Sequence, residues 1–305
     1  MRMYVGVTDF DWYSFLREQR FDEVNFWKPG STPFKAIREN EMFLFKLHAP
    51  RNYIVGGGFF VRFSILPIFL AWDAFGMKNG TNTLRELNNS IQKYRKSIGG
   101  DSMNQSIGCI ILTDPFFFDE KDWIPAPINW SNSIVQGKTY TTNDEIGAEL
   151  YKQVTERLNS QAVRKSILPQ DEPRFSKSIT KHQLGQGAFK VAVTEAYQRR
   201  CAITGERTLP VLEAAHIMPC SENGPHDVTN GILLKSDFNT LFADGYITIT
   251  DKLHIEVSPR LHTDYGNSEY YYGYNGKQLL ITPQSPSEMP DKEFLHWHNK
   301  HVYLG

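Results

Sequence analysis

One stretch decides how the C-terminal part of this chain folds: LEAAHIMP at 212–219, NGILL at 230–234 and SDFNTLFADGYIT at 236–248. The first run is short and apolar and ends at His216, and Gly224-Pro225 marks a loop after it. Asn230 then opens a second apolar run, and Asn239 follows nine positions later, at the start of a helical pattern. The order of strand, loop, strand and helix predicts a compact ββα unit.

The segments on either side extend this pattern. CAITG at 201–205 precedes it, YITI at 246–249 forms an exit strand, and FLHWHN at 294–299 closes the chain. In this combination, residues 187–303 resemble the HNH endonucleases. The resemblance implies a C-terminal ββα-metal domain at 187–305 that binds one metal ion and hydrolyses phosphodiester bonds.

The resemblance also assigns roles to three residues. His216 would be the general base, because a histidine with a pKa of about 6.5 can take a proton from water near neutral pH. Asn230 would brace the loop and orient the imidazole, as residues behind a catalytic site commonly do. Asn239 corresponds to the third motif position, which is most often a metal-binding histidine.

Asn239 departs from the family pattern. Its amide oxygen is a hard, neutral ligand that suits Mg²⁺ or Mn²⁺ better than Zn²⁺. Three interpretations stay open: a natural H-N-N variant, an engineered or decayed inactive site, and a residue that caps the backbone of its own helix.

A second departure lies directly before the histidine, where many HNH enzymes have an acidic ligand and this chain has Ala215. Because side chains alternate along a strand, Glu213 points to the same side as Ala215 and is the nearest carboxylate. Glu213 is therefore either a metal ligand or a solvent-facing charge. We expect one divalent ion, Mg²⁺ or Mn²⁺, with other transition ions as alternatives.

The three cysteines, at 109, 201 and 220, form no Cys-x-x-Cys pair. This argues against a disulfide framework and against a structural zinc site. No stretch approaches the ~18 apolar residues of a membrane span, and the N-terminus lacks a basic region followed by a long apolar run. We expect a cytoplasmic protein without membrane contact.

Charge is unevenly distributed along the chain, although the formal net charge is only −1. Residues 161–200 contain 8 Lys/Arg and 3 Asp/Glu, whereas residues 201–305 contain 7 and 13. The basic segment could contact DNA, but a solvated linker explains its charge equally well. We expect residues 141–186 to form a helical, basic linker. Four of the side chains that could follow a phosphate backbone are Arg164, Lys165, Lys177 and Lys181.

Residues 1–140 are expected to be mainly strands, because apolar, β-branched or aromatic runs at 42–47, 54–61 and 107–112 alternate with turn residues. Capping boxes at Thr83 to Glu86 and Thr142 to Glu145 predict two helices. This order resembles the PUA superfamily, in particular its EVE-like and ASCH-like modules. The resemblance implies a PUA-like β-barrel with helices, so the expected fold class of the whole chain is α+β.

PUA-like modules attached to nucleases resemble sensors that extrude a base from the duplex and hold it among aromatic side chains. Such a pocket needs flat apolar faces and a few polar groups for the base edge. Loop contexts and neighbouring polar residues favour Trp27, Trp72 and Trp130 as pocket residues, and Asp73 could accept a hydrogen bond from a cytosine amino group. Most of the aromatic residues in this part of the chain must nevertheless belong to the core, and Asp73 could equally face solvent.

The whole pattern resembles the modification-dependent type IV restriction endonucleases. It predicts an enzyme that acts on double-stranded DNA carrying a modified cytosine. Two alternatives remain: a binding protein whose HNH site no longer cleaves, and a nuclease gated by a small nucleotide. The sequence leaves open whether the chain forms a homodimer.

Overall fold

The computed structural model of the chain describes residues 1–95, 105–131, 133–166, 184–266 and 268–305. The chain divides into two compact units, Met1–His182 and Gln183–Gly305. Each unit has a core of its own, so the two are considered separately.

The first unit is built on a mixed sheet with the strand order β2-β5-β4-β3-β1-β7, and β6 pairs with β4. All neighbours are antiparallel except β1 and β3, which are parallel. The strands are β1 (Arg2–Thr8), β2 (Glu23–Lys28), β3 (Met42–Leu47), β4 (Tyr53–Pro67), β5 (Ser106–Phe117), β6 (Ile124–Pro125) and β7 (Gly137–Thr141).

The expected β-barrel is not closed in the described part of this unit. Closure requires the two end strands of the path to pair with each other. Here β2 pairs with β5 and β7 pairs with β1, so β2 and β7 remain the two edges of an open sheet. The long strand β4 bends through two register shifts, between Gly57 and Phe59 and between Phe60 and Arg62, as β-bulges do. The chain nevertheless has the expected mixed α+β character.

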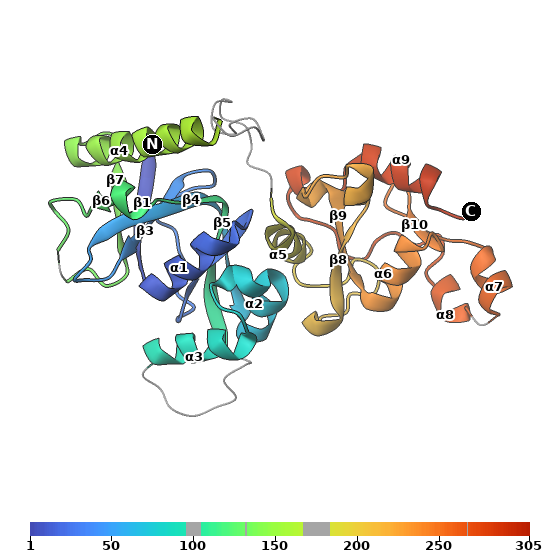
Figure 1. Cartoon of the computed structure of the whole chain (residues 1–305). Coiled ribbons are helices and arrows are strands. Elements are labelled where there is room, and N and C mark those ends of the chain that lie inside the picture. Colours follow the sequence, from blue (N-terminus) through green and yellow to red (C-terminus); the bar gives the residue numbers. More distant parts are fainter. Residues whose placement is uncertain (96–104, 132, 167–183, 267) are drawn as a thin grey trace. The chain divides into compact units, whose positions relative to one another are not determined.

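Helices cover both faces of this sheet. Figure 1 shows α4 along one side and α1, α2 and α3 on the other. The core on the α1 side is rich in aromatic rings, whereas Leu150, Val154 and Leu158 of α4 fill the other core. The helical elements are α1 (Phe10–Gln19), α2 (Ile68–Phe75), η1 (Gly76–Asn79), α3 (Leu84–Tyr94), η3 (Glu120–Asp122) and α4 (Glu145–Ser166).

The capping pattern explains where two of these helices begin. Thr83 Oγ1 accepts a hydrogen bond from the Glu86 amide at 3.2 Å, which confirms the predicted start of α3. For α4 the cap is Asp144, whose carboxylate accepts from the Gly147 amide at 2.8 Å. Thr142 does not cap this helix, because its hydroxyl accepts a hydrogen bond from the N-terminal amine instead. Since α4 packs into the core on its side of the sheet, it belongs to the first unit.

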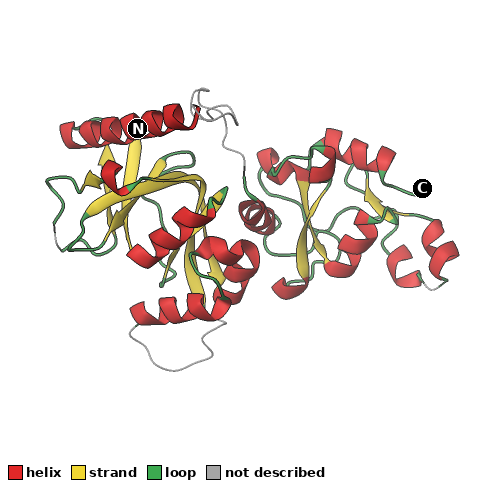
Figure 2. Cartoon of the chain, viewed as in Figure 1, coloured by secondary structure: helices red, strands yellow, loops and turns green. Residues whose placement is uncertain are grey.

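The second unit contains the ββα arrangement. Strands β8 (Leu212–His216) and β9 (Gly231–Lys235) are antiparallel, with His216 opposite Gly231, and α6 (Ser236–Ala243) follows β9 directly. Figure 2 shows the two strands between α5 and α6. The remaining elements are α5 (Gln186–Ala196), η4 (Leu209–Val211), η5 (Cys220–Glu222), η6 (Val228–Asn230), β10 (Ile247–Ile249), β11 (Ile255–Val257), α7 (Arg260–Tyr265), α8 (Glu269–Tyr272), η7 (Pro286–Glu288) and α9 (Lys292–His301).

The core of the second unit joins the ββα arrangement to the C-terminal helix. Phe242 of α6 stacks on His298 of α9, with ring centroids 3.8 Å apart and planes 7° apart. His298 is 2% exposed, and its two ring nitrogens pair with Thr248 Oγ1 at 2.8 Å and the Phe242 carbonyl at 3.0 Å. The closing segment of the chain is therefore a structural part of this unit. No helix among the described residues is long and apolar enough to cross a membrane.

Candidate functional site

His216 stands at the end of β8 and is half-buried. Its imidazole stacks on Phe189 of α5, with ring centroids 3.9 Å apart and planes 14° apart. Burial, and next the charge of nearby His226, lower the pKa of His216 to about 4. The ring is therefore neutral at physiological pH, the form that can accept a proton or bind a metal ion.

Asn230 holds the loop that follows His216. Its side chain is fully buried: Nδ2 donates to the carbonyls of Met218 and Pro225, each at 2.9 Å, and Oδ1 accepts from the Met218 amide at 2.9 Å. Three hydrogen bonds from one amide satisfy the backbone on both sides of the loop, as a buried amide requires. This geometry suits the bracing role that the resemblance implies, with Asn230 acting through the loop backbone.

The loop is also closely packed on itself. A Cβ at Gly224 would lie 1.8 Å from the Met218 carbonyl oxygen, so only glycine fits there. The Gly224 amide donates to the Pro219 carbonyl at 3.0 Å. The turn that carries Cys220 therefore lies close to Met218 and Pro219, the residues that follow β8.

Two side chains of this loop meet His216. Nε2 of His216 lies 2.9 Å from Nδ1 of His226, and Sγ of Cys220 lies 3.7 Å from Nε2 of His216 and 3.9 Å from both ring nitrogens of His226. One potential ligand atom from each residue lies within 4.8 Å of the other two. Sequence reasoning missed this cluster, although His-x₃-Cys-x₅-His was the available signal. The expectation of no structural zinc rested on a different pattern, Cys-x-x-Cys.

Glu213 and Asn239 form a second pair. Nδ2 of Asn239 donates a 2.5 Å hydrogen bond to Oε2 of Glu213, so α6 and β8 are linked at this point. Asn239 lies inside α6, and the N-cap position belongs to Lys235, which makes no side-chain cap. Asn239 therefore does not cap its helix, and that interpretation is wrong. The carboxylate and amide oxygens of this pair are of the kind that Mg²⁺ and Mn²⁺ prefer.

The two groups contact different helices. His216 stacks on a residue of α5, whereas Glu213 bonds to a residue of α6. Among the described residues, no hydrogen bond or ion pair joins His216 to Glu213 or Asn239. The structure thus brings the expected metal ligands together, and separately fixes the expected base with its loop.

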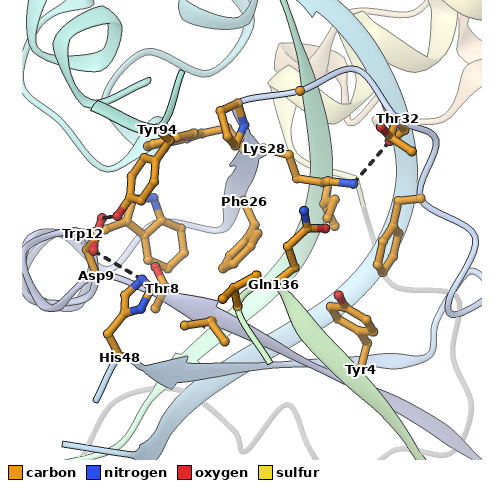
Figure 3. A pocket seen from close by; sticks show the side chains of 17 residues that line it. Tyr4, Thr8, Asp9, Trp12, Phe26, Lys28, Thr32, His48, Tyr94 and Gln136 are labelled. Atoms are coloured by element: carbon orange, nitrogen blue, oxygen red, sulfur yellow. Dashed lines mark hydrogen bonds and ion pairs between the residues drawn. The ribbon is translucent and has the colours of Figure 1, made fainter. Parts of the chain in front are cut away.

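The first unit contains a pocket of about 730 Å³ that opens beside the end of β2. Figure 3 shows aromatic rings on its walls and polar side chains around them. Trp27 is one of the lining residues, and its indole nitrogen donates to the Asn79 carbonyl at 3.1 Å. Its ring lies 6.2 Å from that of Tyr94, tilted by 59°. Other aromatic lining residues are Tyr4, Trp12, Phe26 and Phe34.

Polar groups lie on two sides of this pocket (Figure 3). On one side, Asp9 accepts a 2.5 Å hydrogen bond from the Tyr94 hydroxyl and lies 3.6 Å from Nε2 of His48. On another, Lys28 donates to the Thr32 carbonyl at 3.2 Å, and burial lowers the pKa of its amine. Flat apolar faces with a few placed polar groups are typical of small-molecule and base pockets.

The other proposed pocket residues lie elsewhere. Trp72 and Asp73 are on α2 and do not line this pocket. Trp130 packs against the core on the α4 side, where Lys46 Nζ lies 4.8 Å from the centre of its ring. Of the proposed pocket residues, only Trp27 lines the described pocket.

The side chains of the proposed DNA-backbone residues lie outside the described part of the chain. Arg164 and Lys165 fall in the last turn of α4, where only the backbone is described, and Lys177 and Lys181 lie outside the described residues. Their role stays a prediction.

Comparison with known proteins bears on the second unit. Residues 201–250 match the HNH endonuclease family model. This segment carries β8, the loop, β9, α6 and β10, so the ββα unit described above is of the HNH type. The match begins at Cys201 and includes His216, Asn230 and Asn239. A search of curated protein sequences found no match to this chain.

Three solved structures show distant similarity. A mutant of ZmASCH from Zymomonas mobilis has 9% identity and a TM-score of 0.33, over 49% of this chain and 96% of the other. The modification-dependent restriction endonuclease TagI has 12% identity and a TM-score of 0.28, over 92% and 75%. The type IV phosphorothioation-dependent restriction endonuclease ScoMcrA has 13% identity and a TM-score of 0.21, over 78% and 52%. With TM-scores below 0.5, these similarities carry no further conclusion.

Proposed function

We propose that this chain is a DNA endonuclease that cleaves DNA carrying a modified base. The observation that carries the proposal is a half-buried, neutral His216 at the end of β8, on a loop fixed by Asn230, within the segment that matches the HNH family. A phosphodiester hydrolase needs a positioned proton acceptor of this kind.

The hydrolytic step follows from this geometry. His216 takes a proton from a water molecule, and the resulting hydroxide attacks phosphorus. The bond from phosphorus to the 3′ oxygen breaks, and the departing oxygen takes a proton from a solvent water molecule. This leaves a 5′-phosphate on one fragment and a 3′-hydroxyl on the other. Stacking on Phe189 holds the imidazole in a fixed plane, which reduces the entropy lost on reaching the reactive arrangement.

A Mg²⁺ or Mn²⁺ ion at Glu213 and Asn239 would supply positive charge to the phosphate and the departing oxygen. The two side chains present hard oxygen ligands, and Mg²⁺ completes its coordination with water. The hydrogen bond between them keeps both side chains on the same side of β8.

The pocket of the first unit would hold the modified base, a cytosine turned out of the duplex. Its volume, about 730 Å³, falls within the range of ligand pockets. Trp27, half-exposed in the wall, offers a stacking face, while Lys28 and Asp9 supply a donor and an acceptor near it. The double-stranded DNA partner follows from this proposal.

A second candidate is a protein that binds modified DNA without cleaving it. The observation that favours it is the Asn239–Glu213 hydrogen bond, because the Asn239 amide uses its donor on the carboxylate that a metal ion would need. In that case the pocket would still bind modified DNA.

A digestion panel tests the proposal. The full chain is incubated with otherwise identical duplexes that are plain, methylated, hydroxymethylated or phosphorothioated, each with Mg²⁺, Mn²⁺, Co²⁺ or Ni²⁺. We expect cleavage of at least one modified duplex and none of the plain duplex. Binding without cleavage across all ions would support the second candidate, and binding only to free nucleotides would support a nuclease gated by a small ligand.

A further inference from the structure

The three side chains that converge at the start of the β8–β9 loop are one thiol and two imidazoles. Nε2 of His216 lies 2.9 Å from Nδ1 of His226. Sγ of Cys220 lies 3.7 Å from Nε2 of His216 and 3.9 Å from Nδ1 of His226. The three residues lie within the eleven-residue segment 216–226, and their ligand atoms meet in one place. The hydrolytic scheme above uses only His216.

These separations are close to those around a tetrahedral ion. Zinc binds histidine nitrogen at about 2.0–2.1 Å and cysteine sulfur at about 2.3 Å, which places neighbouring ligand atoms about 3.3–3.6 Å apart. The two distances from sulfur are slightly longer than this, and the distance between the imidazole nitrogens is slightly shorter. Small side-chain rotations of His226 and Cys220 would bring all three to the ion.

We propose that His216, Cys220 and His226 form a binding site for one soft divalent transition ion, such as Zn²⁺, Co²⁺ or Ni²⁺. Three protein ligands leave a fourth position open to water, as in sites that are not purely structural. Thiolate and imidazole ligands favour these ions over Mg²⁺ and Ca²⁺, which prefer oxygen.

The site is held in place before any ion arrives. Asn230 fixes both sides of the loop, and the hydrogen bond from the Gly224 amide to the Pro219 carbonyl closes the turn that carries Cys220. Phe189 sets the plane of the His216 ring. Support of this kind reduces the conformational entropy that the ligand side chains lose when an ion binds, and it is a regular feature of metal sites.

Cys220 is exposed, so its thiol is accessible to an incoming ion. Binding replaces the thiol proton, and the thiolate then coordinates the ion. The other two cysteines, Cys109 and Cys201, are buried and lie outside the cluster.

One consequence rests on the proposed function. The ion then uses the one nitrogen lone pair that a neutral imidazole has for accepting a proton, because the other ring nitrogen of His216 carries hydrogen. A soft ion at this site and hydrolysis with His216 as base therefore exclude each other. We expect Zn²⁺ to inhibit cleavage that is supported by Mg²⁺.

Cobalt titration tests the site without reference to cleavage. The metal-free full chain is titrated with Co²⁺, and the near-ultraviolet charge-transfer absorption of a cobalt–thiolate bond is recorded. We expect a band that saturates at one ion per chain in the wild type. Cys220→Ser should abolish the band, and His226→Asn should weaken cobalt binding by more than the about 10- to 100-fold that loss of a supporting partner costs.

His262→Asn is the matched control, because His262 is exposed on α7 and outside the cluster. It should bind cobalt as the wild type does. Thermal unfolding with and without Zn²⁺ checks the variants independently of the spectrum, because an ion that binds only the folded state raises the Tm. Zn²⁺ should raise the Tm of the wild type and of His262→Asn more than that of Cys220→Ser. A cobalt–thiolate band that persists in Cys220→Ser, or its absence in the wild type, would overturn the site.

Cleavage assays test the consequence. Each protein's rate with Mg²⁺ and added Zn²⁺ is divided by its own rate with Mg²⁺ alone. Inhibition that is weaker in Cys220→Ser than in wild type would support the competition, and acceleration by Zn²⁺ in the wild type would overturn it. If no protein cleaves DNA, the proposed function fails, while the cobalt titration still decides the metal site.

Discussion

Asn239 donates a 2.5 Å hydrogen bond from its amide nitrogen to the carboxylate of Glu213, and this contact links α6 to β8. By the HNH resemblance, Asn239 occupies the third motif position, which is most often a metal-binding histidine, and Glu213 lies two residues before Ala215, the position of the family's acidic ligand. Because the amide nitrogen cannot coordinate a cation, the side chain of Asn239 can contribute only its oxygen. In the proposed metal site, the identity of this residue should therefore determine which ions bind.

Asn239→His tests that dependence. An imidazole binds Ni²⁺ and Co²⁺ more strongly than an amide oxygen does. When both forms also carry Cys220→Ser, which weakens the binding of these ions at His216, we expect the Asn239→His change to raise cleavage with these ions by about tenfold or more. Rates with Mg²⁺ should stay equal or fall. Initial rates of both forms, measured side by side with each ion, give the comparison. A rise with Mg²⁺ alone would contradict the assignment of Asn239 as a metal ligand.

His216→Ala removes the proposed base. We expect the cleavage rate to fall by about 10²–10⁴, because this is what the loss of a general base typically costs. DNA binding should persist, since the imidazole makes no part of the pocket in the first unit. His262→Ala, at an exposed histidine on α7, is the control. Cleavage by His216→Ala within a factor of two of wild type would show that another group accepts the proton.

Trp27→Ala tests the pocket. Stacking of a base on an aromatic ring contributes about 1–3 kcal/mol, so the affinity for modified DNA should fall by roughly 5- to 150-fold. Trp72→Ala is the matched control, because Trp72 lies on α2 away from the pocket. A fluorescence titration with labelled duplexes measures both. Equal losses in the two variants would point to a general effect on folding.

The stability of the second unit should depend on pH through His298. Burial lowers the pKa of this histidine to about 4, below its ordinary value of about 6.5, so the folded state binds fewer protons than the unfolded state. Its contribution is complete above about pH 6.5 and is lost progressively as the pH falls toward 4, by up to about 3 kcal/mol.

Denaturant unfolding of the full chain between pH 7 and pH 4 measures this dependence. His298→Gln should lower the free energy of unfolding at pH 7 and make it less sensitive to pH. Some dependence should remain, because the pKa of His216 is lowered in the same direction. If His298→Gln keeps the wild-type dependence of the free energy of unfolding on pH, His298 is excluded as a source of the acid sensitivity.

Local sequence patterns were sufficient to predict the ββα unit. The apolar run that ends at His216, the asparagine that opens the next strand and the helix after it follow each other closely, so their order alone fixes their pairing. Thr83 and Glu86 likewise predicted the start of α3, because a cap depends on neighbours three residues apart.

Features that depend on distant contacts were not predictable. The sheet of the first unit stays open, because closure depends on how its edge strands meet and not on the pattern within any strand. The spacing His-x₃-Cys-x₅-His indicates candidate ligands, but it does not show that they meet: His226 approaches His216 because the loop folds back, held by the hydrogen bonds of Asn230. Trp130 was assigned to a pocket from its polar neighbours, although its ring packs against the core near Lys46.

The most direct test of the account compares two duplexes that differ in a single modified cytosine. Wild-type protein and His216→Ala are each incubated with both duplexes and Mg²⁺ or Mn²⁺, and initial cleavage rates are measured together with the chemistry of the new ends. We predict that wild-type protein cleaves the modified duplex faster than the plain one and leaves 5′-phosphate and 3′-hydroxyl ends, and that His216→Ala cleaves neither at a comparable rate. Equal rates on the two duplexes with every modification tested, or cleavage that survives the loss of His216, would contradict it.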